Sequence, residues 1–381
     1  MAGIDRYVDE LRAAGALTSA ALADAFRAVP REIFLSSGFH GPGGRWVASG
    51  DPGFLDAVYR DTVLVTKVRD GVPVSSSSQP SLMATMLSAL AVTPGMRVLE
   101  IGAGTGYNAA LLAALGASVT SIDVQEDVAA AAGSALARCG VTAARVLLAD
   151  GYDGAPDGAP YDRIIATAGV SGLSAAWADQ LAPDGLIVAP VAHGGIQPVM
   201  TARRVAGEWR ARAVCAAGFM TAAGALSARH AGSHPPPMVL PPEETGTGVA
   251  APLDGPEDGD SVASDSGSRG GASAAEYQDV WFAAAAWDRR VTSAPALFRE
   301  RLGGFALHEP GPPVSAAAFL PDGRIRVAGP AAERLAHDLA ALAGRWRGCG
   351  SPPLSAWSVA LALGGDAGRP IWAPAAFTLA S

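Results

Sequence analysis

Cysteine is scarce in this chain, which argues against a fold stabilised by disulfide bonds or by a cysteine-bound zinc ion. Cys139, Cys215 and Cys349 are the only cysteines among 381 residues. Because their number is odd and they lie far apart, neither a disulfide framework nor a cysteine-based zinc site is expected. We therefore predict three reduced thiols.

Long apolar runs are also missing. No stretch approaches the roughly twenty uninterrupted apolar residues that a membrane-spanning helix needs, although hydrophobic residues make up 49% of the chain. The opening residues, Met1 to Arg6, lack the apolar core of a signal peptide. These absences predict a cytoplasmic protein with no membrane partner.

The chain has no excess of positive charge. Its formal net charge is −8, and the segment from Gly232 to Ala275 contains seven acidic residues and a single arginine. The remainder is therefore near neutral and offers no general nucleic-acid-binding surface. His308 and His337 lack the spacing of metal ligands, so no metal site is predicted.

The acidic segment also predicts how the chain is divided. It is rich in Pro, Gly, Ser and Asp and nearly free of aromatic residues, so it cannot bury enough surface to offset its ordering entropy. We interpret 232–276 as a flexible linker. It separates a helical region (1–75) and a core (76–231) from a C-terminal α+β domain (277–381).

The most informative motif is Val98 to Tyr107, which reads Val-Leu-Glu-Ile-Gly-Ala-Gly-Thr-Gly-Tyr. An apolar strand runs here into a glycine-rich turn. Glycines at 102, 104 and 106 permit positive φ and the close approach of a ligand. The helix that follows can direct its N-terminal amides at that ligand. A tight strand-to-helix connection without a ligand is the alternative.

An acid downstream favours a nucleotide cofactor. The apolar run 117–122 ends in Asp123, seventeen residues after Gly106, where a carboxylate can accept hydrogen bonds from a ribose diol. The third glycine comes one residue earlier than in the dinucleotide fingerprint, which disfavours NAD. The pattern resembles motif I of class I S-adenosylmethionine-dependent methyltransferases.

Strand and helix patterns alternate from Arg97 onward, which predicts a parallel, doubly wound α/β sheet. Earlier apolar residues at helical spacing predict two helices near the N-terminus. The expected strands are 97–101, 118–122, 144–148, 163–166 and 186–191, and the expected helices between them are 108–115, 125–139 and 174–181.

Two further segments extend the cofactor site. Asp150 and Gly151 follow the third strand, where a carboxylate and amides can meet an adenine ring, although a simple Asp-Gly turn explains them equally well. The strand ending near Thr167 finishes in small residues, which leave space above the sheet edge. The predicted cofactor residues are Glu100, Gly102, Gly104, Thr105, Gly106, Asp123, Val124, Asp150, Gly151 and Thr167.

From about Leu17 to Val191 the chain resembles the protein-L-isoaspartate O-methyltransferase family. Besides motif I, the matching segments are 28–34 (Ala-Val-Pro-Arg-Glu-Ile-Phe), 59–61 (Tyr-Arg-Asp), 78–83 (Ser-Gln-Pro-Ser-Leu-Met) and 180–191. The resemblance implies a Rossmann-like methyltransferase core over 76–231 and a substrate-side region over 1–75. It also implies S-adenosyl-L-methionine as cofactor and methyl transfer to an aspartyl or isoaspartyl carboxylate in a polypeptide.

The resemblance also places the acceptor site. The resemblance implies that Ser78 matches the family's substrate-facing hydroxyl residue, and we predict Ser77, Ser78 and Gln79 as the catalytic residues that hold the acceptor. A carboxylate is ionised at pH 7 and a sulfonium methyl is already activated, so the reaction needs alignment and desolvation but no metal. For the serines from Ser75 onward, the alternative is a helix cap and solvated turn, which we prefer for Ser75.

Two features resemble a branch of the family that acts on ribosomally made, modified peptides. Repair enzymes usually carry Gln-Thr-Ile before this motif, whereas here Ser75 to Ser77 are all serine and a long C-terminal region follows. That branch methylates an ordinary aspartate, and the ester leads to aspartimide and then isoaspartate. We take this as the leading hypothesis and isoaspartyl repair as the second. The Ser-Gln-Pro match disfavours a small-molecule methyltransferase. The intact motif I with Asp123 disfavours a catalytically silent binding module.

The C-terminal region offers candidate contacts for a peptide. Residues 317–327 predict a hairpin around Pro-Asp-Gly, and 331–346 an amphipathic helix. The aromatic residues of 279–282 and Trp287 are either peptide anchors or core. We expect an α+β module that packs on the catalytic domain.

Overall fold

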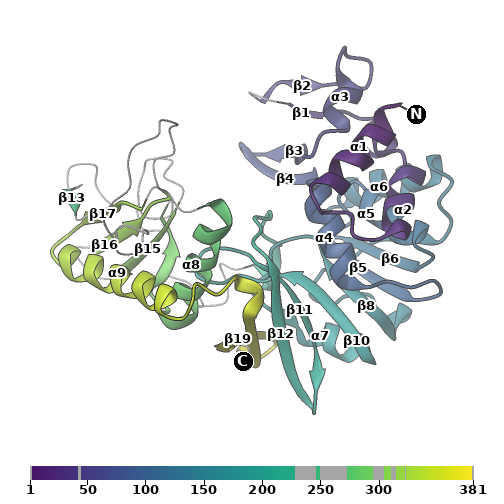
Figure 1. Cartoon of the computed structure of the whole chain (residues 1–381). Coiled ribbons are helices and arrows are strands. Elements are labelled where there is room, and N and C mark those ends of the chain that lie inside the picture. The colour runs from purple at the N-terminus through teal and green to yellow at the C-terminus, as the bar shows by residue number, and fades with distance from the viewer. Residues whose placement is uncertain are drawn as a thin grey trace.

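The computed structural model describes residues 2–41, 44–227, 246–248, 273–294, 304–309, 315–321 and 323–379. Figure 1 shows two bodies joined by long strands: helices and strands of the N-terminal half on one side and a smaller α/β module on the other. Most of the predicted linker, 232–245 and 249–272, lies outside the described residues.

The N-terminal region combines helices with a small sheet. Its helices are α1 (Ala2–Ala13), α2 (Ala20–Ala28), a 3-10 helix (Arg31–Leu35), α3 (Phe54–Val58) and α4 (Pro80–Leu90). Its antiparallel sheet has the order β2-β1-β3-β4, made of β1 (Phe39–His40), β2 (Trp46–Val47), β3 (Leu64–Arg69) and β4 (Val72–Ser77). The predicted N-terminal helices are confirmed, and Ser19 caps α2 by accepting from Leu22 N at 3.1 Å.

A ten-stranded sheet forms the centre of the molecule, in the order β7-β6-β5-β8-β10-β11-β12-β18-β19-β9. The strands from β7 to β10 are parallel, and the others pair antiparallel. The bounds are β5 (Arg97–Ile101), β6 (Ser118–Asp123), β7 (Ala144–Leu148), β8 (Tyr161–Ala166), β9 (Leu173–Ser174), β10 (Leu181–Pro190), β11 (Val199–Val205), β12 (Glu208–Cys215), β18 (Trp357–Asp366) and β19 (Arg369–Leu379).

The predicted doubly wound α/β core is confirmed. The helices α5 (Tyr107–Ala114), α6 (Glu126–Arg138) and α7 (Ala175–Gln180) connect its parallel strands. The chain orders β5, β6 and β7 toward one edge and β8 and β10 toward the other, so its direction across the sheet reverses between β5 and β8. Ligands of such sheets bind at the carboxyl ends of the strands beside that reversal.

Apolar side chains pack on both faces of the large sheet. One core unites the N-terminal helices with α4, α5 and α6, and includes the buried Phe26 and Leu112. The other lies against α7, where Trp177 is fully buried, and continues into the C-terminal module, where Phe282 is fully buried. No helix within the described ranges is long and apolar enough to cross a membrane. All three cysteines are free, as predicted.

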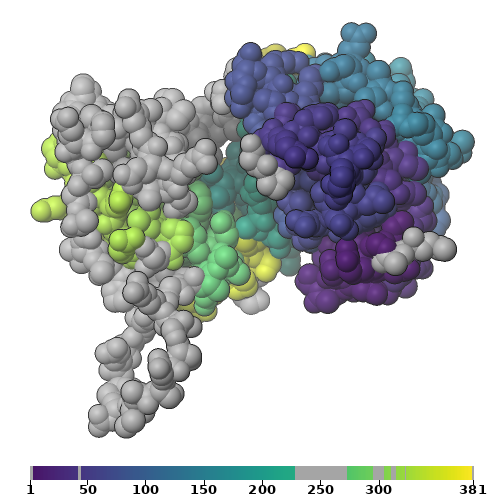
Figure 2. All heavy atoms as spheres, turned by 90° about the horizontal axis from the view of Figure 1, so that it is seen from above, coloured from purple at the N-terminus to yellow at the C-terminus, as the bar shows by residue number. Residues whose placement is uncertain are grey.

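The described residues of the C-terminal module form an antiparallel sheet and two α-helices. The sheet has the order β13-β17-β16-β15-β14 and the predicted hairpin and amphipathic helix are both present. Its elements are β13 (Gly246–Gly248), α8 (Ala274–Trp287), β14 (Val291–Ser293), β15 (Phe305–Glu309), β16 (Ser315–Phe319), β17 (Ile325–Ala328) and α9 (Ala332–Gly348). In Figure 2 this module and the purple and blue N-terminal part form separate lobes.

The structure divides the C-terminal region differently from the predicted boundaries. Strand β13 lies inside the predicted linker and pairs with β17, and α8 begins at Ala274. The last two strands leave the module, and β18 pairs with β12 in the large sheet. Of the candidate aromatic anchors, Trp281 and Phe282 are buried core, because α8 packs against both sheets.

Candidate cofactor and acceptor site

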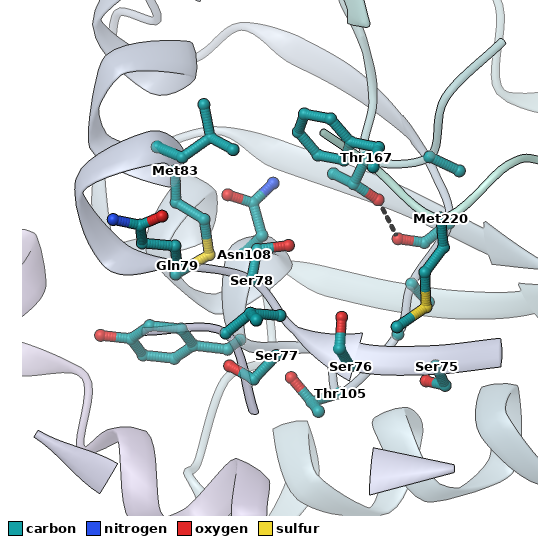
Figure 3. Close-up of a pocket in the computed structure, with 18 of the residues that line it drawn as sticks. Ser75, Ser76, Ser77, Ser78, Gln79, Met83, Thr105, Asn108, Thr167 and Met220 are labelled. Carbon is teal, nitrogen blue, oxygen red and sulfur yellow. Dashed lines mark hydrogen bonds between the residues drawn. The ribbon is translucent and has the colours of Figure 1, made fainter. Parts of the chain in front are cut away.

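Two adjoining cavities open at the carboxyl ends of the parallel strands. One has a volume of about 530 Å³ and the other about 930 Å³. Both are lined by Gly102 and Asp123, and Phe219 and Met220 line both from the segment after β12. Figure 3 shows the smaller cavity, with the serine segment, Ser75 to Ser78, along one part of its lining and Thr167 and Met220 along another. Sequence reasoning missed Phe219 and Met220, because no local motif marks them.

The glycine turn brings backbone close to the cavity wall. Gly102 has φ +97°, and a Cβ there would lie 2.7 Å from Thr167 Oγ1. Thr167 donates its hydroxyl to Gly102 O at 2.6 Å. Gly104, at φ +52°, faces Ser76 O, which a Cβ would approach to 3.2 Å. A side chain at either position would crowd these neighbours and would need an unfavourable positive φ, and α5 begins directly after Gly106.

Asp123 is held in place at the end of β6. Its Oδ2 accepts from Gly104 N at 3.1 Å and its Oδ1 accepts from Gln125 N at 3.0 Å. Each carboxylate oxygen can accept a second hydrogen bond, so Asp123 is oriented but still able to bind a diol. Its neighbour Val124 is 52% exposed and lines the larger cavity.

Asp150 lines the larger cavity, next to Gly151. Its Oδ1 accepts from Tyr152 N at 2.9 Å, and its Oδ2 accepts from Arg369 Nη1 at 2.7 Å. Partial burial acts to raise the pKa of Asp150, but the bonds from Arg369 and Tyr152 outweigh it and hold the pKa below its usual value. Arg369 begins β19, 219 residues away, and sequence reasoning did not find it.

Glu100 is buried beneath the smaller cavity. It accepts from Asn108 Nδ2 at 2.7 Å and from Ser121 Oγ at 2.6 Å. Burial raises the pKa of Glu100 to about 7, against the lowering effect of these two bonds. A carboxyl group that titrates near neutrality therefore borders the predicted cofactor site, together with Thr105 from the glycine turn.

The serine segment, Ser75 to Ser78, lines the smaller cavity beside the glycine turn. Along β4 and just beyond it, Ser75 and Ser77 are buried, whereas Ser76 and Ser78 are half-buried. Ser75 accepts from Thr66 Oγ1 at 3.3 Å. All four serines line the cavity, as Figure 3 shows.

The alternative in which serines cap the next helix is wrong. Asp61 performs this role, because its Oδ1 accepts from Ser81 N at 2.8 Å. The side-chain amide of Gln79 donates to the other oxygen of Asp61 at 3.1 Å. The exposed Gln79 is thus tied to the helix start at the rim of the cavity.

Ser77 and Ser78 are both held by one buried arginine. Arg31 donates from Nε and Nη2 to Ser77 Oγ at 3.3 and 3.2 Å, and from Nη2 to Ser78 O at 2.9 Å. Arg31 belongs to the Val-Pro-Arg segment, so its presence was visible in the sequence but its contact with the acceptor segment was not. No group of three or more metal-binding side chains occurs within the described parts of the chain.

Comparisons with known proteins agree with this geometry. A family model described as protein-L-isoaspartate(D-aspartate) O-methyltransferase (PCMT) matches residues 4–227. A protein-L-isoaspartate O-methyltransferase of Thermotoga maritima is 36% identical over 173 residues, 45% of this chain and 50% of that protein. The chain thus spans about half the length of that relative. A protein of the same name from Methylorubrum extorquens is 36% identical over 199 residues, 52% of this chain and 78% of the relative.

A solved structure titled protein-L-isoaspartate O-methyltransferase is similar over both regions of the chain. It has 25% sequence identity and a TM-score of 0.53, and the match covers 98% of this chain and 99% of the other. A C-terminal region beyond the core is therefore not in itself a departure from proteins of that title. This removes one of the two features that favoured the peptide-modifying branch.

Proposed function

The chain belongs to the protein-L-isoaspartate(D-aspartate) O-methyltransferase family, and on this basis we propose that it methylates the carboxylate of an isoaspartyl residue in a polypeptide. S-adenosyl-L-methionine is the methyl donor in this proposal. The observation that carries it is the arrangement of the two cavities. Gly102 and Asp123 line both cavities, the serine segment joins them in the smaller one, and Asp150 with Gly151 joins them in the larger one.

The residues of the larger cavity fit an adenosyl group. Asp123 presents a fixed carboxylate for a ribose diol, and Asp150 with Gly151 borders the space for an adenine ring. Gly102 and Gly104 both have positive φ and line the smaller cavity, which suits a ligand that contacts backbone. When bound, the cofactor supplies an activated methyl group on a sulfonium.

The smaller cavity would hold the acceptor. Hydroxyls of Ser76 and Ser78 and the amide of Gln79 border it, and these groups can bind a carboxylate without protonating it. One carboxylate oxygen forms the new bond to the methyl carbon as the carbon–sulfur bond breaks, and the electron pair stays on sulfur. Negative charge on the acceptor and positive charge on sulfur vanish together, so a desolvated site favours the transfer.

A second candidate is methylation of an ordinary aspartate in a modified peptide, with aspartimide as the later product. The observation that favours it is the all-serine segment Ser75 to Ser77, where the repair enzymes usually carry Gln-Thr-Ile. The family assignment and the relatives' names support the isoaspartyl acceptor better.

The two candidates are separated by their acceptors. We would incubate the full chain with labelled S-adenosyl-L-methionine and either an isoaspartyl peptide or a constrained aspartyl peptide, and follow peptide mass over time. Methylation of the isoaspartyl peptide alone supports the proposal. Methylation of the aspartyl peptide followed by loss of methanol supports the second candidate, and labelling of neither peptide contradicts both.

A further inference from the structure

Among the residues that the structure describes, no buried anion lies beside the buried cation Arg31. Its side chain is fully enclosed, with 0% of its surface exposed, at the start of the 3-10 helix Arg31–Leu35. Charged groups in protein interiors are normally paired, because an unpaired charge loses its hydration without compensation. An arginine also stays charged when it is buried, so this site retains a positive charge.

Every N–H group of Arg31 binds a neutral oxygen. Nη1 donates to the carbonyls of Val58 at 2.8 Å and Arg60 at 3.2 Å, and Nη2 donates to that of Thr62 at 3.3 Å. The remaining bonds go to Ser77 Oγ and Ser78 O. These oxygens satisfy the donors but do not cancel the charge.

No carboxylate in the described parts of the chain forms an ion pair with Arg31. Asp61 acts on it through its field, but both Asp61 oxygens are bonded to the start of α4. Glu32, its sequence neighbour, accepts from Tyr59 instead. The ring of Tyr107 lies 5.9 Å from the guanidinium carbon and adds only a weak attraction.

The cavity is the remaining place for a counter-charge. Ser77 and Ser78 line it and are the same two residues that Arg31 holds. Because Ser77 Oγ accepts two N–H groups from Arg31, its own proton is free to be donated elsewhere. A carboxylate bound at this wall would therefore lie one side chain away from the buried cation.

We propose that Arg31 is the positioning residue that makes this cavity selective for a negatively charged acceptor, acting through Ser77 and Ser78. The inference rests on the proposed function only in requiring a carboxylate acceptor. Isoaspartate and aspartate meet this requirement equally, so it survives if the second candidate replaces the first. The substrate supplies the anion that the described part of the chain does not place beside Arg31, and Arg31 favours the carboxylate over its neutral amide.

The test compares binding of matched charged and neutral peptides. Affinities for an isoaspartyl peptide and the corresponding isoasparaginyl peptide would be measured by calorimetry with S-adenosylhomocysteine present. Arg31→Gln should weaken the isoaspartyl peptide roughly tenfold or more, as expected for loss of a charge-assisted interaction, and leave the neutral peptide within about twofold. Arg31→Lys keeps the charge and should retain most of the preference.

Two further variants keep the test decisive. Arg163 is a matched control, because it also donates to backbone carbonyls, of Leu90 and Asp162, but does not line either cavity. Arg163→Gln should leave the charged-to-neutral preference unchanged. Ser77→Ala removes one oxygen that Arg31 binds, and should reduce the preference even if Arg31→Gln does not fold.

The outcomes distinguish this inference from the proposed function. Equal weakening of both peptides in the folded variants would make Arg31 structural support only and overturn the inference. An unchanged preference in Arg31→Gln or Ser77→Ala would overturn it as well. If the wild type methylates only the aspartyl peptide, the proposed acceptor is wrong, and the same comparison with aspartyl and asparaginyl peptides decides the role of Arg31.

Discussion

Arg369 Nη1 lies 2.7 Å from Asp150 Oδ2, so the last strand of the chain is joined to the loop that borders the cofactor cavity. The guanidinium carbon of Arg369 also lies 5.1 Å from the centre of the Tyr152 ring, and Tyr152 donates to Pro370 O at 2.8 Å. Three contacts thus connect residues 150–152 to the start of β19. The C-terminal strands support the site from behind without lining it.

We predict that Arg369→Gln weakens cofactor binding several-fold, because Asp150 loses the partner that orients its carboxylate. The effect should be modest, since Arg369 is 41% exposed and solvent screens the pair. Calorimetry with S-adenosylhomocysteine measures it. Arg204→Gln is the control, because Arg204 packs over Trp209 away from both cavities. Equal affinity of Arg369→Gln and wild type would show that the ion pair has no role in binding.

Asp123→Ala should lower cofactor affinity roughly 10- to 100-fold, the range expected for hydrogen bonds to a charged group. The variant loses the oxygens available to a ribose diol and also the bond to Gly104 N that shapes the glycine turn. Asp123→Asn keeps one side-chain oxygen, so its cofactor affinity should lie between those of wild type and the alanine variant. Wild-type affinity in the alanine variant would remove Asp123 from the site.

Ser78→Ala should lower methyl transfer about tenfold while leaving cofactor affinity nearly unchanged, because Ser78 borders the acceptor side of the cavity. The control is Ser88→Ala, since the hydroxyl of Ser88 bonds to that of Thr18 and lines neither cavity. Initial rates at saturating cofactor would be compared for both variants. Unchanged turnover in Ser78→Ala, or equal loss in both variants, contradicts the assignment.

Glu100 should make stability depend on pH. Burial raises its pKa in the folded protein from 4.5 to about 7, so the folded state binds a proton more tightly than the unfolded state. The free energy of unfolding should therefore fall as pH rises through this window, by an amount on the order of 3 kcal/mol.

Glu100→Gln removes this titration. The variant should unfold at a higher urea concentration than wild type at about pH 8, and lose that advantage at about pH 5. Asn108 can still donate to the amide oxygen at position 100, so the local packing is preserved. Stability curves that run parallel for the two proteins between these pH values would contradict a raised pKa.

Local patterns carried most of the information about the core. The alternation from Arg97 onward predicted the parallel strands and helices, with β8 starting two residues and β10 five residues earlier than expected. Strand and helix periods and the glycine turn are properties of adjacent residues, so they can be seen without the fold. The Asp123 position followed from the same reasoning, because a βαβ unit sets the spacing between strand ends.

The sequence by itself determined the doubly wound core, the glycine turn and the strand that ends in Asp123, because each depends on residues close along the chain. Only the tertiary structure decided that Arg31 meets Ser77 across 46 residues, that Arg369 meets Asp150 across 219, and that Asp61 rather than a serine caps α4. It also decided that β18 and β19 complete the central sheet. Such contacts form only when the chain folds and distant segments share one buried surface, so no local period or spacing in the sequence predicts them.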